Sequence, residues 1–239
     1  MKVLPNAPIR HPLGHIIETP DVTIFFGDWK SNAQVLTTAF PEYQLRFVRQ
    51  THSDLVVISS SPFDHLTEEN ADAHLTKKRK LALCIRTADC LPLMIFEPQT
   101  RLVAAIHAGW RGLANGIILK TCDRLRGLSG TLESAHAWIG PHIGAENFEV
   151  GRDVAFELES SFDAVRGFSP LRSVIRDHIN SQKAYVDLLA LARAQLKSYG
   201  IDNERTNTLA VDTYLSREHA SYRRDAALAG RQISFIALK

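Results

Sequence analysis

The sequence predicts an α+β protein in which packed mixed β-sheets are flanked by helices. Many short apolar runs have the length of a strand, and only a few segments show helical spacing. The two kinds of segment do not alternate strictly, which argues against a doubly wound parallel sheet. No linker rich in Pro, Gly or Ser and no change in composition divides the chain, so we expect a single domain over residues 1–239.

The clearest pattern lies between residues 81 and 118. Three apolar runs, residues 81–85, 91–96 and 102–106, are each predicted to be strands. Residues 113–125 follow with helical spacing. Polar residues come directly after the first and third runs. A thiol and an imidazole at strand ends, beside a glycine-bearing helix start with free N–H groups, form a plausible functional site.

The remaining elements are expected on both sides of this stretch. Residues 1–20 contain four prolines and are predicted to be irregular or an edge segment. A helix is predicted over residues 32–40 with Ser31 as its cap, a second from residue 154, and a third over residues 186–199. The other predicted strands are residues 22–26, 45–48, 55–59, 135–139, 208–211 and 233–238.

Composition and charge exclude several classes of protein. With 28 basic and 26 acidic residues the net charge is +2, which gives no electrostatic argument for binding nucleic acid or a membrane surface. No signal peptide and no apolar stretch of membrane-spanning length is found. The three cysteines do not suggest a disulfide framework, so a reducing cytoplasm is the expected compartment. Neither nucleic acid nor a membrane is therefore an expected partner.

Three side chains with metal-binding chemistry lie at predicted strand ends or in loops beside strands: His52, Cys90 and His107. Two imidazoles and one thiolate suit zinc, and three protein ligands leave a fourth position for water or substrate. Their spacing matches no short zinc signature, so a buried thiol with two unrelated histidines is the alternative. Cys90 is also a candidate nucleophile that His107 would activate.

The sequence allows more than one role for each polar residue near these three. Asp89 can orient an imidazole, carry protons or cap a turn, and Arg111 can bind an anion at a helix start or form a surface salt bridge. Arg223 and Arg224 are adjacent, and neighbouring side chains in a strand point to opposite faces, so at most one is expected to face a site. Cys84 and Cys122 are predicted to be core thiols, and the other eight histidines to be surface or turn residues.

Six motifs, in order from residue 49 towards the C-terminus, resemble one family. They are RQTHSDLV, ADAHLT, RTADCLPLMIF, AAIHAGWRGLANGI, IGPHIGAENFEVG and SYRRD. This combination resembles the YfiH-like proteins, which are also catalogued as laccase-domain or polyphenol oxidase proteins and as purine nucleoside phosphorylases. The chain departs from the family pattern where Ser53 replaces a usual Gly, where a usual Cys before SYRRD is missing, and where His219-Ala220 replaces an aromatic pair.

The resemblance implies one zinc-type site with His52, Cys90 and His107 as its ligands. It also implies phosphorolysis of adenosine, inosine, guanosine and methylthioadenosine, and deamination of adenosine. A zinc ion with three protein ligands can activate water for attack at a purine carbon, and Asp89 is the nearest carboxylate in the sequence to move protons. We expect Asp89, Cys90 and Arg111 to serve catalysis.

Several arginines are expected to hold phosphate and substrate. They are Arg49, Arg111 and Arg224, or its neighbour Arg223. A multicopper oxidase is rejected because the chain has ten histidines and no His-x-His pair, although copper can occupy such a site in vitro. One alternative is a cysteine hydrolase or amidase that uses Cys90 and His107, with a peptidoglycan precursor as its candidate substrate. The other is a protein that binds nucleotides or partners without catalysis.

Overall fold

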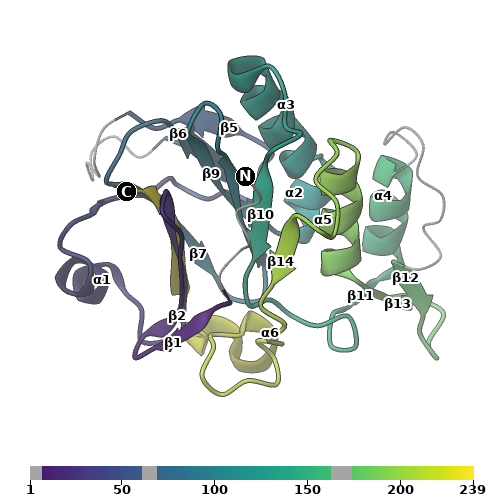
Figure 1. Ribbon diagram of the computed structural model, residues 1–239. Helices are drawn as coiled ribbons and strands as arrows, with labels where there is room; N and C mark the ends of the chain where they lie inside the picture. Colours follow the sequence, from purple (N-terminus) through teal and green to yellow (C-terminus); the bar gives the residue numbers. More distant parts are fainter. Residues whose placement is uncertain (1–6, 61–68, 163–173) are drawn as a thin grey trace.

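Two six-stranded sheets packed face to face form the centre of the protein (Figure 1). The structure is a computed structural model that describes residues 7–60, 69–162 and 174–239. The first sheet has the order β1 (Ile9–His11), β2 (Gly14–Glu18), β3 (Val22–Gly27), β15 (Gln232–Leu238), β7 (Leu81–Thr87) and β4 (Gln44–Arg46). The second has the order β14 (Thr206–Thr208), β10 (His136–Ile139), β8 (Leu91–Glu97), β9 (Leu102–Ala108), β6 (Ala73–Thr76) and β5 (Val56–Ile58).

Both sheets are mixed, as the sequence predicts. Most neighbouring strands are antiparallel, whereas β4 with β7, β5 with β6 and β10 with β14 are parallel pairs. The proline-containing N-terminal segment contributes β1 and β2 at the edge of the first sheet, which agrees with its expected edge position. The α+β prediction is therefore confirmed.

The central apolar runs are continuous because β8 and β9 are covered on both faces. Met94 and Phe96 pack between the two sheets, whereas Leu91, Leu93 and Ile95 point to the opposite face. When both faces of a strand are buried, successive residues are all apolar and do not alternate with polar ones. Every residue of β8 and β9 is accordingly buried.

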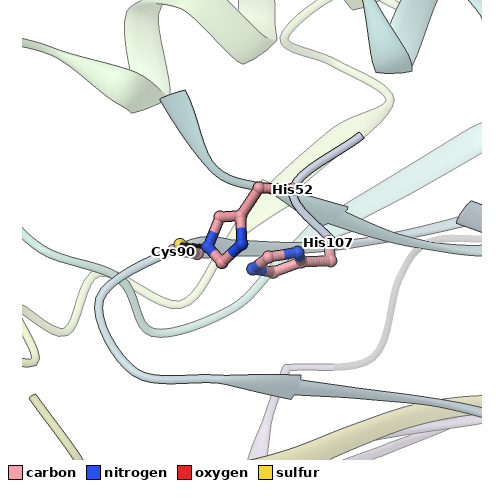
Figure 2. Close-up of side chains that lie close together, drawn as sticks. All are labelled: His52, Cys90 and His107. Carbon is pink, nitrogen blue, oxygen red and sulfur yellow. Dashed lines mark hydrogen bonds between the residues drawn. The ribbon is translucent and has the colours of Figure 1, made fainter. Parts of the chain in front are cut away.

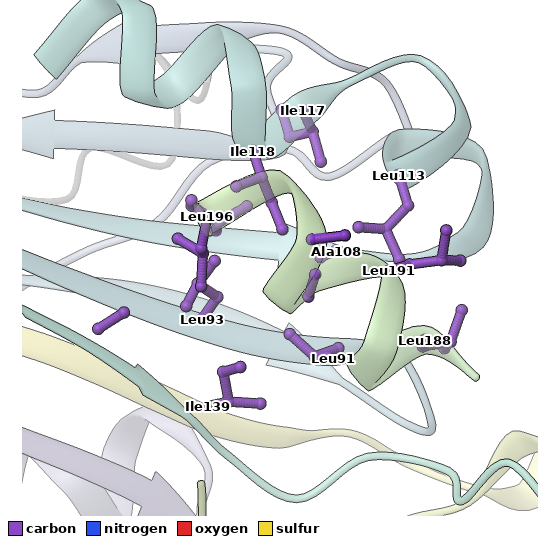
Figure 3. Close-up of a cluster of buried hydrophobic side chains, with 14 of the residues drawn as sticks. Leu91, Leu93, Ala108, Leu113, Ile117, Ile118, Ile139, Leu188, Leu191 and Leu196 are labelled. Atoms are coloured by element: carbon purple, nitrogen blue, oxygen red, sulfur yellow. The ribbon is translucent and has the colours of Figure 1, made fainter. Parts of the chain in front are cut away.

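Helices cover the outer faces of the sheets. Figure 3 shows Leu188, Leu191 and Leu196 from one of these helices in the same apolar cluster as residues of β8 and β10. A third, three-stranded sheet lies in the order β11 (Glu149–Gly151), β13 (Lys183–Val186) and β12 (Ile175–Asp177). The helices are α1 (Ala33–Ala39) on the first sheet, α2 (Trp110–Ala114), α3 (Ile117–Ser129) and α5 (Leu188–Lys197) on the second, α4 (Arg152–Phe162) on the small sheet, and α6 (Tyr222–Asp225).

Three local predictions were wrong. The helix predicted over residues 113–125 is two helices, because Gly116 between them has the left-handed φ of 77°. The cap of α1 is Asn32, whose side chain accepts a hydrogen bond from the Val35 N–H, and not Ser31. The SYRRD segment is a short helix capped by Ser221, so its two arginines are not related as neighbours in a strand.

Three of the eight histidines expected at the surface or in turns are buried. His74 lies in β6 between the sheets, His142 lies in the segment after β10, and His219 lies in the segment before α6. His65 belongs to the connection outside the described residues. No helix among the described residues is both long enough and apolar enough to cross a membrane.

Candidate metal centre and binding cavity

The three predicted metal ligands come together at one end of the second sheet (Figure 2). His52 lies in the loop between β4 and β5, Cys90 lies just before β8, and His107 lies in β9. The Cys90 Sγ is 3.9 Å from the His52 Nε2, and all three donor atoms lie within 4.8 Å of one another. This is slightly wider than the separation of about 4 Å that zinc bonds of 2.0–2.3 Å imply. The group can hold one metal ion.

Strand pairing brings two of the ligands together. In the antiparallel pair of β8 and β9, Leu91 lies opposite Ala108 and Pro92 lies opposite His107. Cys90 is the residue directly before this ladder and therefore lies beside His107. The separation of 17 residues in the sequence is the length of one hairpin plus its flanking residues.

Gly109 leaves the space into which the ligands converge. A Cβ atom at this position would lie 3.1 Å from the Cys90 Sγ and 3.1 Å from the His52 Cδ2. Such contacts are closer than ordinary van der Waals packing allows. The backbone angles of Gly109 are φ −75° and ψ 166°, which any residue can adopt. The glycine is therefore needed for space and not for backbone freedom.

Asp72 is a residue of the site that the sequence reasoning missed. Its carboxylate accepts hydrogen bonds from the backbone N–H groups of Thr51, His52 and Ser53 at 3.1, 3.1 and 2.6 Å. It also accepts one from the Ser53 Oγ at 2.7 Å and lies 2.7 Å from the His107 Nδ1. The available signal was an acidic residue directly before an apolar strand, in the ADAHLT motif, where a surface residue is unexpected.

Gln50 holds the same loop from the other side and was also missed. Its side-chain amide donates to the Arg86 carbonyl and accepts from the Arg86 N–H, both at 2.7 Å. This pair of hydrogen bonds imitates one rung of a β-ladder and joins the loop to the end of β7. The loop that carries His52 is thus fixed to both sheets.

The electrostatics of the site favour the ionised forms of Cys90 and Asp72. Burial would raise the pKa of the Cys90 thiol, but the charge of His107 and hydrogen bonds from both imidazoles lower it to about 6. Burial also opposes the ionised form of Asp72, yet hydrogen bonds from His107 and Ser53 lower the pKa of this carboxyl to about 2. Burial raises the pKa of the Cys122 thiol to about 12, as expected for a core thiol.

A cavity of 650 Å³ opens beside the three ligands. Its charged lining is almost entirely basic, and Asp89 is the carboxylate among the described residues that line it. Aromatic rings complete the wall. This combination suits a ligand with an anionic group and a flat ring. The arginines are Arg49, Arg86, Arg111, Arg223 and Arg231, and the aromatic residues are Trp110, Phe148 and Tyr222.

The structure distinguishes which of the arginines expected to bind phosphate line the cavity. Arg49 and Arg111 line the cavity, and the Arg111 guanidinium lies 4.4 Å from the centre of the Trp110 ring. Arg223 also lines the cavity, where its guanidinium donates to two backbone carbonyls at 2.7 and 3.3 Å. The choice of Arg224 needs correction, because it is not among the described residues that line the cavity.

Arg224 instead holds together the loop that precedes α6. Its guanidinium donates to the carbonyl oxygens of Thr213, Tyr214, Ser216 and His219, and it pairs with Asp225 at 2.7 Å. These acceptors all lie in the loop or in α6, so the Arg224 guanidinium stabilises the loop and is not available to bind a ligand.

Asp89 lies on the cavity wall and also anchors the loop around α6. One carboxylate oxygen accepts a hydrogen bond from the Thr213 Oγ1 at 2.7 Å, and the other accepts from the Arg223 N–H at 2.6 Å. Asp89 has φ 78°, an unusual backbone conformation for a residue other than glycine. The carboxylate therefore fixes the segment that presents Arg223 to the cavity.

The fold and this site define a laccase-domain protein. The family model described as "Multi-copper polyphenol oxidoreductase laccase" matches residues 28–239, so the chain belongs to this family, whose members include YfiH-named proteins. The described residues bring together one group of three ligands, His52, Cys90 and His107. A single such group does not supply the four copper sites that a multicopper oxidase needs.

Relatives place the chain within the YfiH-like proteins. It is 30% identical to a purine nucleoside phosphorylase of Clostridium acetobutylicum over 211 residues, which are 87% of this chain and 83% of that protein. It is also 30% identical to the purine nucleoside phosphorylase YfiH of Escherichia coli K12, over 80% of this chain and 73% of that protein.

Solved structures share the fold. The crystal structure of a hypothetical YfiH protein of Bacillus licheniformis has a TM-score of 0.86 at 24% identity and covers 96% of this chain and 97% of that one. The crystal structure of YlmD from Geobacillus stearothermophilus has a TM-score of 0.84 at 20% identity and covers 98% of this chain and all of that one. These similarities confirm the α+β architecture.

Proposed function

We propose that this chain is a zinc-dependent purine nucleoside phosphorylase that also deaminates adenosine. The proposed substrates are adenosine, inosine, guanosine and methylthioadenosine. The observation that carries the proposal is the convergence of His52, Cys90 and His107 at the wall of a basic, aromatic-lined cavity. The names of the curated relatives support the phosphorylase part.

The cavity contains groups for both substrates of a phosphorolysis. Arg49, Arg111 and Arg223 can hold the phosphate dianion, and the rings of Trp110 and Phe148 can stack on the purine. A phosphate oxygen attacks C1′ of the sugar while the bond from C1′ to the base nitrogen breaks. The bonding electrons leave with the base, which takes up the proton that hydrogen phosphate loses, and the sugar 1-phosphate is released as a dianion. The protein's task is to position the phosphate and to stabilise the developing charge.

Deamination would use the ligand side of the same cavity. When bound, zinc would supply the Lewis acidity that activates a water molecule near neutral pH. Asp89 would carry protons between this water and the leaving amine. Although both of its oxygens accept hydrogen bonds, each carboxylate oxygen has a second lone pair and can still take a proton.

The test combines metal analysis with a nucleoside assay. Purified protein is analysed for zinc and copper, and then incubated with adenosine, inosine, guanosine and methylthioadenosine, with and without inorganic phosphate. We expect free base and sugar 1-phosphate only when phosphate is present, and inosine from adenosine in its absence. Release of neither product from any nucleoside by zinc-loaded protein would refute the proposal.

A pair of cysteine variants separates the zinc enzyme from a cysteine hydrolase. Cys90→Ser should lose both zinc and turnover, whereas Cys122→Ala, which removes a buried thiol on α3, should retain both. Chelation should abolish turnover of the wild-type protein, and added zinc should restore it. Full activity without metal that is lost on alkylation of Cys90 would favour the hydrolase instead.

A further inference from the structure

We infer that Asp72 is the positioning residue of the metal centre, because one buried carboxylate fixes the orientation of both histidine ligands. It holds His107 through the imidazole ring and His52 through the backbone. The inference rests on the proposed metal site and adds to it a residue that itself contacts neither metal nor substrate. Asp72 is fully buried, so no water competes for its oxygens.

The contact with His107 decides which ring nitrogen is available to a metal. The His107 Nδ1 lies 2.7 Å from the Asp72 Oδ1, where the carboxylate can only accept, so Nδ1 carries the hydrogen. The lone pair of the neutral ring is then on Nε2, the ring nitrogen that can bind a metal together with Cys90 and His52 (Figure 2). Asp72 thereby selects the tautomer that can bind a metal.

The contacts with residues 51–53 decide where the His52 ring points. His52 has φ 58°, a left-handed conformation that residues other than glycine rarely adopt. This turn aims three successive N–H groups, those of Thr51, His52 and Ser53, at the same carboxylate. Successive N–H groups that converge in this way form a binding concavity for an anion. The unusual backbone of His52 is therefore stabilised by the same residue that orients His107.

Asparagine is the informative substitution at this position because it keeps the shape and removes half of the accepting capacity. If the amide oxygen faces the N–H groups of Thr51 and Ser53, the amide NH₂ faces His107. Its Nδ1 must then accept, and the hydrogen moves to Nε2, the nitrogen that the metal needs. If the amide is turned over, the NH₂ group opposes the N–H groups of the His52 loop. Either orientation disturbs one histidine ligand.

The experiment measures zinc affinity and the cobalt spectrum, and not turnover. Wild type, Asp72→Asn and Ser53→Ala are compared by competition with a chromophoric chelator, and the absorption of the cobalt-loaded proteins reports the bond from Cys90 to the metal. Loss of a residue that orients a metal ligand typically costs about 10–100-fold in affinity, and we expect a loss of this size for Asp72→Asn. Ser53→Ala removes one donor to Asp72 and leaves both histidine contacts, so it should stay within about threefold of wild type.

Each outcome supports or overturns the inference. A folded Asp72→Asn protein with wild-type zinc affinity would overturn it, as would an equal loss in Ser53→Ala, which would show that general loosening of the loop is responsible. If Asp72→Asn does not fold, the ¹⁵N chemical shifts of His107 in the wild-type protein report its tautomer, and a neutral ring with its hydrogen on Nε2 would overturn the inference. A wild-type protein that binds no zinc would refute the proposed metal site as well, which distinguishes the two failures.

Discussion

Gly109→Ala is the sharpest test of how tightly the metal ligands are packed. Because Gly109 has ordinary extended backbone angles, the alanine adds no backbone strain, and the whole effect comes from its Cβ atom. That atom would lie 3.1 Å from both the Cys90 Sγ and the His52 Cδ2, so at least one ligand must move by a few tenths of an ångström. Overpacking of this kind typically costs about 1–3 kcal/mol.

The expected result is a loss of zinc affinity with little change in the fold. A cost of about 1–3 kcal/mol corresponds to roughly 5- to 150-fold weaker binding in the chelator competition assay. The apo protein should unfold at nearly the wild-type temperature, because His52 can swing into the open cavity when no metal holds it. Nucleoside turnover at limiting zinc should fall in parallel.

Gly127→Ala is the matched control. It makes the same substitution within α3, where the added Cβ meets nothing within 4 Å. An alanine within a helix is more stable than a glycine by up to about 1 kcal/mol, so this variant should unfold at a slightly higher temperature with unchanged zinc affinity. Wild-type zinc affinity in Gly109→Ala would refute the reasoning, since it would mean that the ligands have room to spare.

Three further outcomes are expected. Alkylation of Cys90, followed by mass spectrometry, should be slow with zinc bound and fast after chelation, whereas the buried Cys84 and Cys122 should remain unmodified in both states. Arg111→Ala should raise the KM for phosphate by roughly 10- to 150-fold, the range for losing a charge-assisted hydrogen bond. Arg152→Ala should not, because the Arg152 guanidinium pairs with Asp177 and is not among the described residues that line the cavity. Burial lowers the pKa of His74 to about 3, below the unfolded value of 6.5, so its contribution to stability is complete above pH 6.5 and is lost as the pH falls towards 3. In His74→Gln, the urea midpoint should therefore depend less on pH within that window, and an unchanged slope would contradict the assignment.

Local signals in the sequence were sufficient for the central strands and for the chemistry of the ligands. The apolar runs that became β7, β8 and β9 were recognisable because a strand buried on both faces must be continuously apolar. His52, Cys90 and His107 were recognisable because few side chains bind zinc and because these three end or flank predicted strands. Their convergence remained a hypothesis, since their spacing carries no signature.

The errors arose where distant parts of the chain meet. The sequence could not distinguish Arg223 from Arg224, because their roles depend on the carbonyl groups of a folded loop and not on the arginines themselves. It also placed His74 at the surface, because burial of a single polar residue between two sheets depends on which sheet covers its strand. Helix caps and the break at Gly116 depend on one or two backbone angles, which composition does not specify.

The sequence by itself determined the α+β class of the fold, and it predicted a His, Cys, His group within recognisable motifs as a candidate metal site. Only the tertiary structure decided that Asp72, 35 residues from His107 along the chain, lies 2.7 Å from its ring and holds the His52 loop as well. The physical reason is that periodicity and turn chemistry report on residues only a few positions apart in the sequence. The strand order β8, β9, β6 and β5 in the second sheet instead brings Asp72, His107 and the His52 loop together from distant parts of the chain.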